Sequence, residues 1–255
     1  MKQSIEIMKN SIVNILLNNK PSIYLYGSVV LEDFKLGWSD IDILCLTEEA
    51  ITDEQAYQLV NLRQELLGEY KNNAYFRSFE GGFASLDAFI NDFPDKVVYW
   101  GTSGQRIASK LSFDPFSMIE LIESGELLYG NDVRDKFISP TNGDIRRAVI
   151  SHYNTIRKYA VTTNRSLYSA GWILDISRCI YTLRTGKVIA KTKAGEWALD
   201  NNLVPDVEIM EKVINIRKEP NRYKDDNEIM KWTETLGEHI QRYADVLEKE
   251  IVNAK

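Results

Sequence analysis

The sequence is poor in the residues that build disulfide frameworks and metal clusters. Its 255 residues hold two cysteines, Cys45 and Cys179, and two histidines, His152 and His239. Both cysteines lie among apolar residues, which predicts buried, reduced thiols rather than a disulfide or a metal site. Two histidines are too few for a zinc cluster, and neither is flanked by a nucleophile motif. The composition therefore disfavours zinc enzymes and hydrolases that use a histidine-based triad.

Long apolar runs and basic clusters are also absent. The first ten residues lack the continuous apolar core of a signal peptide, and no uncharged apolar run reaches membrane-spanning length. The formal net charge is −6 at pH 7, without a Lys/Arg-rich run. Such a surface disfavours sequence-independent binding to nucleic acid phosphates and suits a cationic partner. We therefore expect a cytoplasmic protein that binds neither nucleic acid nor membranes.

The residues that are present form regular patterns in the first part of the chain. Hydrophobic residues make up 44% and charged residues 27%, as in an ordinary globular protein with room for one or two cores. Thr52 is a plausible N-terminal cap for a helix. The elements predicted from apolar spacing are a helix over 3–19, strands over 22–27 and 40–46, a helix over 52–69, and β-like runs over 74–80 and 83–92.

The second part of the chain has a different pattern. Strand signals largely disappear beyond Asp144 and helical spacing takes over. The predicted helices cover 144–161, 166–185, 191–200, 205–217 and 226–252. Residues 1–140 are therefore predicted to form an N-terminal α/β or α+β domain around a small sheet, and we favour the α+β fold class with a small mixed sheet. An all-α helical-bundle domain is predicted over residues 141–255.

One motif in the N-terminal part carries chemistry. Gly27 and Ser28 end an apolar strand, and after eleven residues the next strand begins with Asp40-x-Asp42. Side chains alternate along a strand, so the two carboxylates share one face at a separation of ~7 Å, as a clamp for Mg²⁺ requires. Gly27 allows a tight turn, and Ser28 offers its hydroxyl and N–H to a phosphate. The alternative is an exposed polar face on an ordinary strand–turn–strand unit; the apolar context favours the functional interpretation.

This arrangement resembles the signature of the polymerase-β-type nucleotidyltransferase superfamily. The resemblance implies that Asp40 and Asp42 bind Mg²⁺ and that Gly27, Ser28 and Ser39 bind the nucleotide. It also implies a third carboxylate on a later strand, next to the pair. Asp87, in the run FASLDAFIND, is the candidate for this position, as a metal ligand or a general base.

A second resemblance covers Ile173–Leu199. The segment is similar to the helical domain of bacterial aminoglycoside adenylyltransferases that modify spectinomycin and streptomycin. Its matching residues are Arg178, Tyr181-Thr182-Leu183, Thr185-Gly186-Lys187, Lys191 and Ala194 through Trp197. The resemblance implies that Arg178 and Lys191 contact the nucleotide phosphates, which need fixed positive charge. Residues 48–110 match this family only loosely.

Two departures from the family pattern bear on function. Related enzymes usually carry Glu as the third carboxylate, and Asp87 is one methylene shorter. Members that accept streptomycin also carry a Trp and an Asp before the arginine. Alignment without gaps back from Arg178 places Tyr159 and Asn164 at those positions, which favours spectinomycin over streptomycin.

The resemblance implies an enzyme that uses Mg²⁺ to transfer AMP from ATP to a hydroxyl of a small cationic antibiotic, conferring resistance. We expect a monomer, although the sequence does not fix the oligomeric state. Spectinomycin is the favoured acceptor; streptomycin, a lincosamide or a protein hydroxyl are the alternatives, and the choice between ATP and GTP stays open. A different class of function is a non-catalytic nucleotide-binding or toxin–antitoxin protein, which the intact carboxylates disfavour. Nucleic acid polymerisation would need a basic groove, which the sequence does not indicate.

Overall fold

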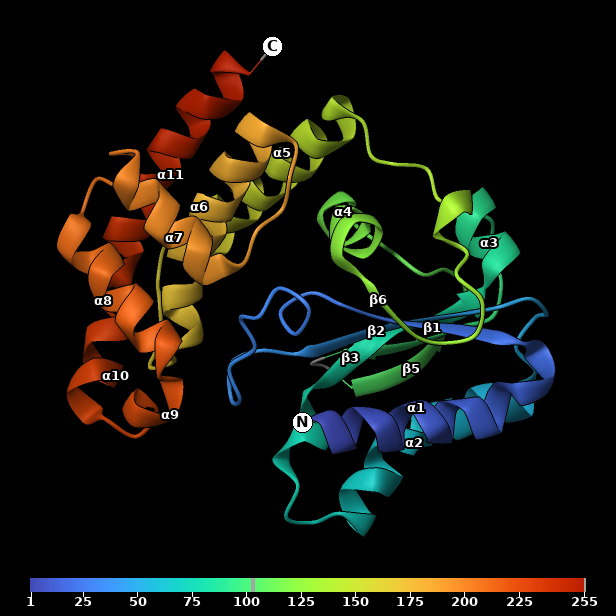
Figure 1. Cartoon of the computed structure of the whole chain (residues 1–255). Helices are drawn as coiled ribbons and strands as arrows, with labels where there is room; N and C mark the ends of the chain where they lie inside the picture. Colours follow the sequence, from blue (N-terminus) through green and yellow to red (C-terminus); the bar gives the residue numbers. More distant parts are fainter. Residues whose placement is uncertain (102–103, 255) are drawn as a thin grey trace. The chain divides into compact units, whose positions relative to one another are not determined.

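The computed structural model describes residues 1–101 and 104–254, and the chain divides into two compact units (Figure 1). The sheet unit comprises Met1–Val30 and Ser39–Ser139. The helical unit comprises Pro140–Lys255 together with the short segment Leu31–Trp38. This segment lies inside the predicted N-terminal range of 1–140, but it packs with the helices. The predicted α+β fold class, with an N-terminal sheet followed by helices, is confirmed.

The sheet is mixed and has six strands in the order β5-β4-β3-β2-β1-β6. β2 and β3 are parallel, and every other neighbouring pair is antiparallel. The strands are β1 (Pro21–Tyr26), β2 (Ile41–Thr47), β3 (Phe79–Ser85), β4 (Val97–Gly101), β5 (Gly104–Ala108) and β6 (Glu126–Tyr129). β1 and β2 lie at the interior of the sheet and are almost entirely buried, which explains their continuous apolar runs.

Helices cover both faces of the sheet. Figure 1 shows α1 and α2 on one face and α3 and α4 on the other. Their bounds are α1 (Lys2–Leu16), α2 (Asp53–Glu69), α3 (Leu86–Asn91) and α4 (Pro115–Ser124), with short 3₁₀ helices at Leu17–Asn19, Ala74–Ser78 and Arg134–Lys136. Tyr24, Tyr26, Leu44 and Leu46 form the core on the α4 side. Because side chains alternate, Asp42 shares this face, at the end where the apolar core stops.

Local sequence signals predict some of these elements and fail for others. Thr52 caps α2 in a capping box with Gln55, which confirms the predicted cap. The prediction of strand over 74–80 is wrong for Ala74–Ser78, which is a 3₁₀ helix, and the prediction over 83–92 is wrong beyond Ser85. There the Ser85 hydroxyl accepts a hydrogen bond from the N–H of Ala88 at 3.3 Å and starts α3. A helix cap outweighs the β-like apolar pattern at this point.

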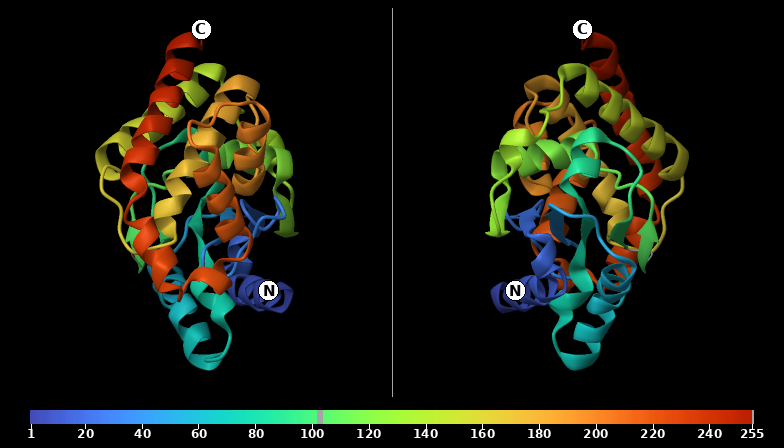
Figure 2. Two further views of the ribbon diagram at one scale, coloured as in Figure 1. Left: turned by 90° about the vertical axis from the view of Figure 1, so that its left-hand side faces the viewer. Right: turned by 90° about the vertical axis from the view of Figure 1, so that its right-hand side faces the viewer.

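The helical unit is a bundle of seven helices in the described residues. They are α5 (Asn142–Tyr159), α6 (Tyr168–Thr185), α7 (Lys191–Asp200), α8 (Val207–Lys218), α9 (Pro220–Tyr223), α10 (Asn227–Thr233) and α11 (Leu236–Asn253). The single helix predicted over 226–252 is divided into α10 and α11. Figures 1 and 2 show α11 alongside α5 and α6, which together form the centre of the bundle. None of the described helices combines the length and the apolarity needed to cross a membrane.

Gly81 on β3, beside Glu80, has no room for a side chain against the backbone of β2. Gly81 has a φ of +153°, and a methyl group there would lie 1.9 Å from the carbonyl oxygen of Ile43. We expect Gly81→Ala to destabilise the protein by about 3 kcal/mol or more, because it combines backbone strain with a backbone clash. Thermal unfolding measures this. Gly68→Ala, in the open surface of α2, is the control and should be neutral or slightly stabilising.

Candidate functional site

A row of three polar side chains crosses three neighbouring strands of the sheet unit. The antiparallel register of β1 and β2 places Tyr26 opposite Asp42, and the parallel register of β2 and β3 places Asp42 opposite Glu80. Directly opposed residues on neighbouring strands have Cβ atoms ~5 Å apart. Asp40 precedes β2 by one residue, so the row brings Glu80 to the Asp40-x-Asp42 pair.

The Gly27-Ser28 turn closes one side of this row. Gly27 has a φ of +71°, and a methyl group there would lie 2.3 Å from Oδ2 of Asp42, so only glycine fits against the carboxylate. The Ser28 hydroxyl donates a hydrogen bond of 3.0 Å to the carbonyl oxygen of Asp40. Ser39, immediately before Asp40, is buried. The turn is therefore held against the start of β2 by a glycine contact and a serine hydrogen bond.

The carboxylate of Asp40 repels the carboxylate of Glu80 in the row. Burial and the nearby charge of Asp40 raise the pKa of Glu80 to about 7, although Arg63 acts in the opposite direction. Burial, and after it the charges of Asp42 and Glu120, holds the pKa of Tyr26 well above its ordinary value. Accumulated negative charge of this kind is relieved by a cation or by a proton.

The residues present fit a hard divalent cation. Carboxylate oxygens are the preferred ligands of Mg²⁺, which in phosphoryl-transfer sites is held by one or two carboxylates together with phosphate oxygens of the substrate. In the described part of the chain, no three Asp, Glu, His or Cys side chains converge closely enough to hold a metal by themselves. Asp40 and Asp42 are the two carboxylates of the motif that could hold such an ion.

A small cavity adjoins the row within the sheet unit. Its volume is about 230 Å³, and Asp42 and Glu80 contribute to its wall. Tyr99 and Asp114 add a phenol and a third carboxylate to the same wall. Asp114 caps α4 by accepting hydrogen bonds from the N–H groups of Phe116 and Ser117.

The predicted basic residues lie in the helical unit. Arg178 is on α6 and Lys191 is the first residue of α7, one helix further along the chain. The Lys191 ammonium forms an ion pair of 2.8 Å with Asp175, one turn before Arg178 on α6. Burial alone would raise the pKa of Asp175. The charges of Lys191, Arg178 and His152, together with the hydrogen bond from Lys191, outweigh this effect, so the pKa of Asp175 lies below its ordinary value. Lys191 and Arg178 thus act on the same half-buried carboxylate.

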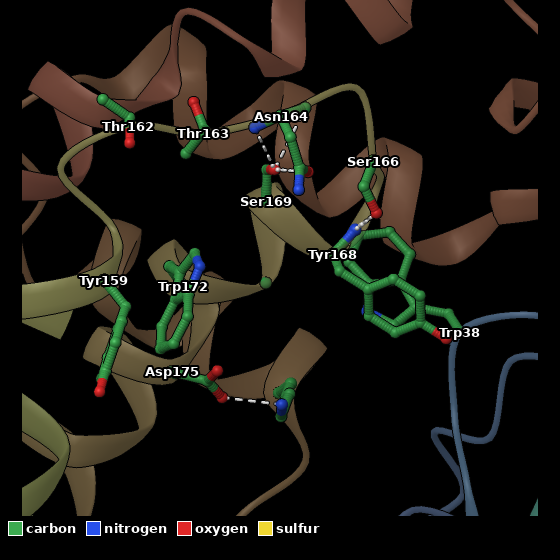
Figure 3. A pocket seen from close by; sticks show the side chains of 12 residues that line it. Trp38, Tyr159, Thr162, Thr163, Asn164, Ser166, Tyr168, Ser169, Trp172 and Asp175 are labelled. Carbon is green, nitrogen blue, oxygen red and sulfur yellow. Dashed lines mark hydrogen bonds and ion pairs between the residues drawn. The ribbon is translucent and has the colours of Figure 1, made fainter. Parts of the chain in front are cut away.

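The helical unit also contains a larger cavity of about 550 Å³ that reaches Lys191 and Asp175 (Figure 3). Aromatic side chains form much of its wall, and hydroxyl and amide groups from the loop between α5 and α6 form the rest. Its lining includes Trp38, Tyr159, Thr162, Thr163, Asn164, Ser166, Tyr168, Ser169, Gly171 and Trp172. Tyr159 and Asn164, which alignment identified as the positions that distinguish streptomycin acceptors, therefore line one cavity.

Comparison with known proteins agrees with this division of the chain. A model of the nucleotidyltransferase domain matches residues 9–78, and a model of the C-terminal domain of aminoglycoside adenylyltransferase matches residues 140–247. Residues 140–247 thus carry the C-terminal domain of the aminoglycoside adenylyltransferases, and residues 9–78 carry a nucleotidyltransferase domain. The chain is a nucleotidyltransferase, and its C-terminal family domain coincides with the helical unit from Pro140 onward.

Two relatives of the adenylyltransferase family are similar over most of the chain. Spectinomycin 9-adenylyltransferase of Staphylococcus aureus is 24% identical over 187 residues, which is 69% of this chain and 70% of the relative. The structure of spectinomycin adenyltransferase AAD(9) of Enterococcus faecalis, with ATP and spectinomycin, superposes with a TM-score of 0.70. It covers 97% of this chain and 99% of its own, at 21% identity, which establishes a shared fold.

The structure corrects the position of the third carboxylate. Asp87 is exposed in the first turn of α3 and accepts a hydrogen bond of 2.6 Å from the amide of Asn91. The register pairs Thr47 with Ser85, so Asp87 lies beyond the opposite end of β3 from Glu80. Glu80 and Ser85 are five strand rises apart along β3, or ~16 Å, and Asp87 lies two residues further on. The prediction that Asp87 adjoins Asp40 and Asp42 is wrong, and Glu80 is the carboxylate that does.

Two signals in the sequence favour Glu80 over Asp87 as the third carboxylate. Adenylyltransferases of this family usually carry Glu at the third position, and Glu80 supplies that residue type without a departure from the pattern. Ser85 followed by Asp87 is also a helix-start signal, which places Asp87 in a helix rather than on a strand. The apolar run around Asp87 predicts a strand, and this prediction favoured Asp87 despite both signals.

Proposed function

We propose that this chain transfers AMP from ATP to a hydroxyl of an aminoglycoside-type antibiotic, with spectinomycin as the first choice, and so confers resistance. The observation that carries the proposal is the row in which Asp42 lies opposite Glu80 and against Gly27. The two matched family domains support the reaction class, and the two spectinomycin-modifying relatives support the acceptor.

The sheet unit supplies the reacting carboxylates in this proposal. Asp40 and Asp42 would hold Mg²⁺, which neutralises phosphate charge and polarises the α-phosphorus when it is bound. The backbone of Gly27 and Ser28 would receive the β- and γ-phosphates, since a tight glycine turn exposes N–H groups. Glu80 is the general base, because the register of β2 and β3 places its carboxylate beside the Asp40-x-Asp42 pair.

The proposed reaction is a single in-line displacement. The acceptor oxygen forms a bond to the α-phosphorus while the bond from that phosphorus to pyrophosphate breaks. The hydroxyl proton of the acceptor passes to the carboxylate of Glu80. Arg178 and Lys191 of the helical unit bind the triphosphate, and Asp175 orients the Lys191 ammonium in the absence of nucleotide.

The cavity of the helical unit is our candidate for part of the acceptor site. Its volume of about 550 Å³ is in the range of small-molecule pockets. Aromatic rings such as Trp172 provide flat surfaces for a cationic sugar-like ligand, and Asn164 provides a neutral amide. The Trp and Asp that accompany streptomycin acceptance in the family are replaced by Tyr159 and Asn164, which supports spectinomycin as the acceptor.

The test measures pyrophosphate release from Mg·ATP with spectinomycin, with streptomycin, with a lincosamide and without an acceptor. We expect release that requires both spectinomycin and a divalent cation, and a product heavier than the drug by one AMP. Chelation of the metal should abolish release. Pyrophosphate release with another acceptor, and none with spectinomycin, would identify that acceptor as the substrate in place of spectinomycin. No release with any drug would contradict the proposal and leave the non-catalytic alternative.

A further inference from the structure

The first turn of α7, which begins with Lys191, is capped by a residue far away in the sequence. Ala190, at the N-cap position, has no side-chain group that can accept a hydrogen bond. Asp33 takes this role: its Oδ2 accepts the N–H of Thr192 at 3.2 Å, and its Oδ1 accepts the Thr192 hydroxyl at 2.7 Å. The carboxylate thus meets the partial positive charge at the start of the helix.

Asp33 is itself held by a buried arginine. Arg217 on α8 donates to the carbonyl oxygen of Asp33 at 3.2 Å and to its carboxylate at 3.3 Å. The side chains of Arg217 and Asp33 are 3% and 7% exposed, so neither charge can be left alone without a large desolvation cost. The guanidinium also lies 5.2 Å from the centre of the Trp38 ring. We call Asp33, Trp38, Thr192 and Arg217 the Asp33 clasp.

The clasp involves a segment that belongs to the nucleotidyltransferase motif by sequence. Leu31–Trp38 lies in the chain between Ser28 and Asp40, yet it is part of the helical unit. Trp38 packs edge-on against Tyr168 with ring centroids 6.3 Å apart, and both line the large cavity. A helix cap therefore anchors the loop of the motif to α7, which begins with Lys191, and a buried ion pair anchors the same loop to α8.

We propose that Asp33 is a positioning residue that acts through Lys191. By capping α7 at Thr192 it holds the adjacent Lys191 backbone in one place, and so determines how well the Lys191 ammonium binds nucleotide phosphates. The inference rests on the proposed role of Lys191 in nucleotide binding. A clasp that only stabilised the fold would change the unfolding temperature and leave nucleotide affinity unchanged.

Thr192→Val is the main test, because it keeps the shape of the side chain and removes one hydrogen bond to Asp33. We expect the Kd for Mg·ATP, measured by calorimetry without acceptor, to rise about tenfold. Thr192→Ser restores the hydroxyl and should bind within about twofold of the wild type. Asp33→Asn is a second variant, with a similar loss of affinity and a lower unfolding temperature.

A double-mutant cycle separates positioning from stability. Lys191→Ala should weaken Mg·ATP binding, and adding Thr192→Val to it should change the Kd by less than about twofold, since the group being positioned is gone. An equal effect of Thr192→Val in both backgrounds, or none in either, would overturn the positioning role. Failure of the proposed function gives a different result. In that case the wild-type chain binds Mg·ATP but releases no pyrophosphate with any acceptor. This result refutes the transfer reaction, and the binding test of Asp33 stays valid. A wild-type chain that does not bind Mg·ATP refutes both.

Discussion

Asp42→Asn is expected to lower the rate of pyrophosphate release by about a thousandfold. The amide has nearly the volume of the carboxylate, so it still fits against Gly27, where a methyl group would lie 2.3 Å from Oδ2. It removes the negative charge that binds Mg²⁺ and leaves the rest of the row unchanged. The measurement is the steady-state rate with saturating Mg·ATP and spectinomycin, together with the unfolding temperature.

Asp87→Asn is the matched control for this prediction. It makes the same chemical change on an exposed turn of α3, beyond the opposite end of β3. Its rate should stay within about twofold of the wild type, as for an ordinary surface substitution. A rate for Asp42→Asn above a tenth of the wild-type value, with the fold intact, would contradict the role of Asp42. A severe loss with Asp87→Asn would restore the original assignment of the third carboxylate.

Glu80→Gln is expected to lower kcat by about 10² to 10³-fold, the usual contribution of a positioned general base. The amide cannot take the acceptor proton at any pH. The KM for Mg·ATP should change by no more than about threefold, because a group needed for proton transfer alone leaves nucleotide binding in place. Separate measurement of kcat and of KM for ATP distinguishes this loss from a loss of metal binding.

Glu80→Asp provides a graded comparison. It keeps a carboxylate but withdraws it by one methylene, so the rate should fall between those of the wild type and of Glu80→Gln. Equal rates for Glu80→Gln and the wild type would exclude Glu80 as the base. A large rise in the KM for ATP with unchanged kcat would instead identify Glu80 as a ligand of the nucleotide-bound metal.

The Asp40-x-Asp42 motif could be predicted from the sequence because its geometry involves only neighbouring residues. Asp40 and Asp42 are two residues apart at the start of an apolar strand, so strand alternation alone predicts that they share a face. Thr52 and Gln55 form their capping box within four residues. Such features need no knowledge of the distant chain, and the structure shows β2 and the cap where the sequence predicted them.

The third carboxylate could not be predicted in the same way, because its position depends on the pairing of strands that are far apart in the sequence. Glu80 reaches Asp42 through the parallel pairing of β2 with β3, whose register is set across the intervening helix α2. An apolar pattern along one strand does not define its register with another. A strand over 83–92 would place Asp87 on the sheet, but the Ser85 cap starts α3 and removes Asp87 from the sheet.

The sequence by itself determined the α+β class, the Gly27-Ser28 turn before Asp40-x-Asp42, and the resemblance of Ile173–Leu199 to an adenylyltransferase helical domain. Each of these is contained in contiguous residues or in periodic apolar spacing. Only the tertiary structure decided that Glu80 stands beside Asp42 and that Asp33 caps α7 while paired to Arg217, 184 positions away. The physical reason is that strand register and buried ion pairs depend on which surfaces of the chain pack against each other and exclude water. These contacts join residues far apart in the sequence and form only in the folded protein.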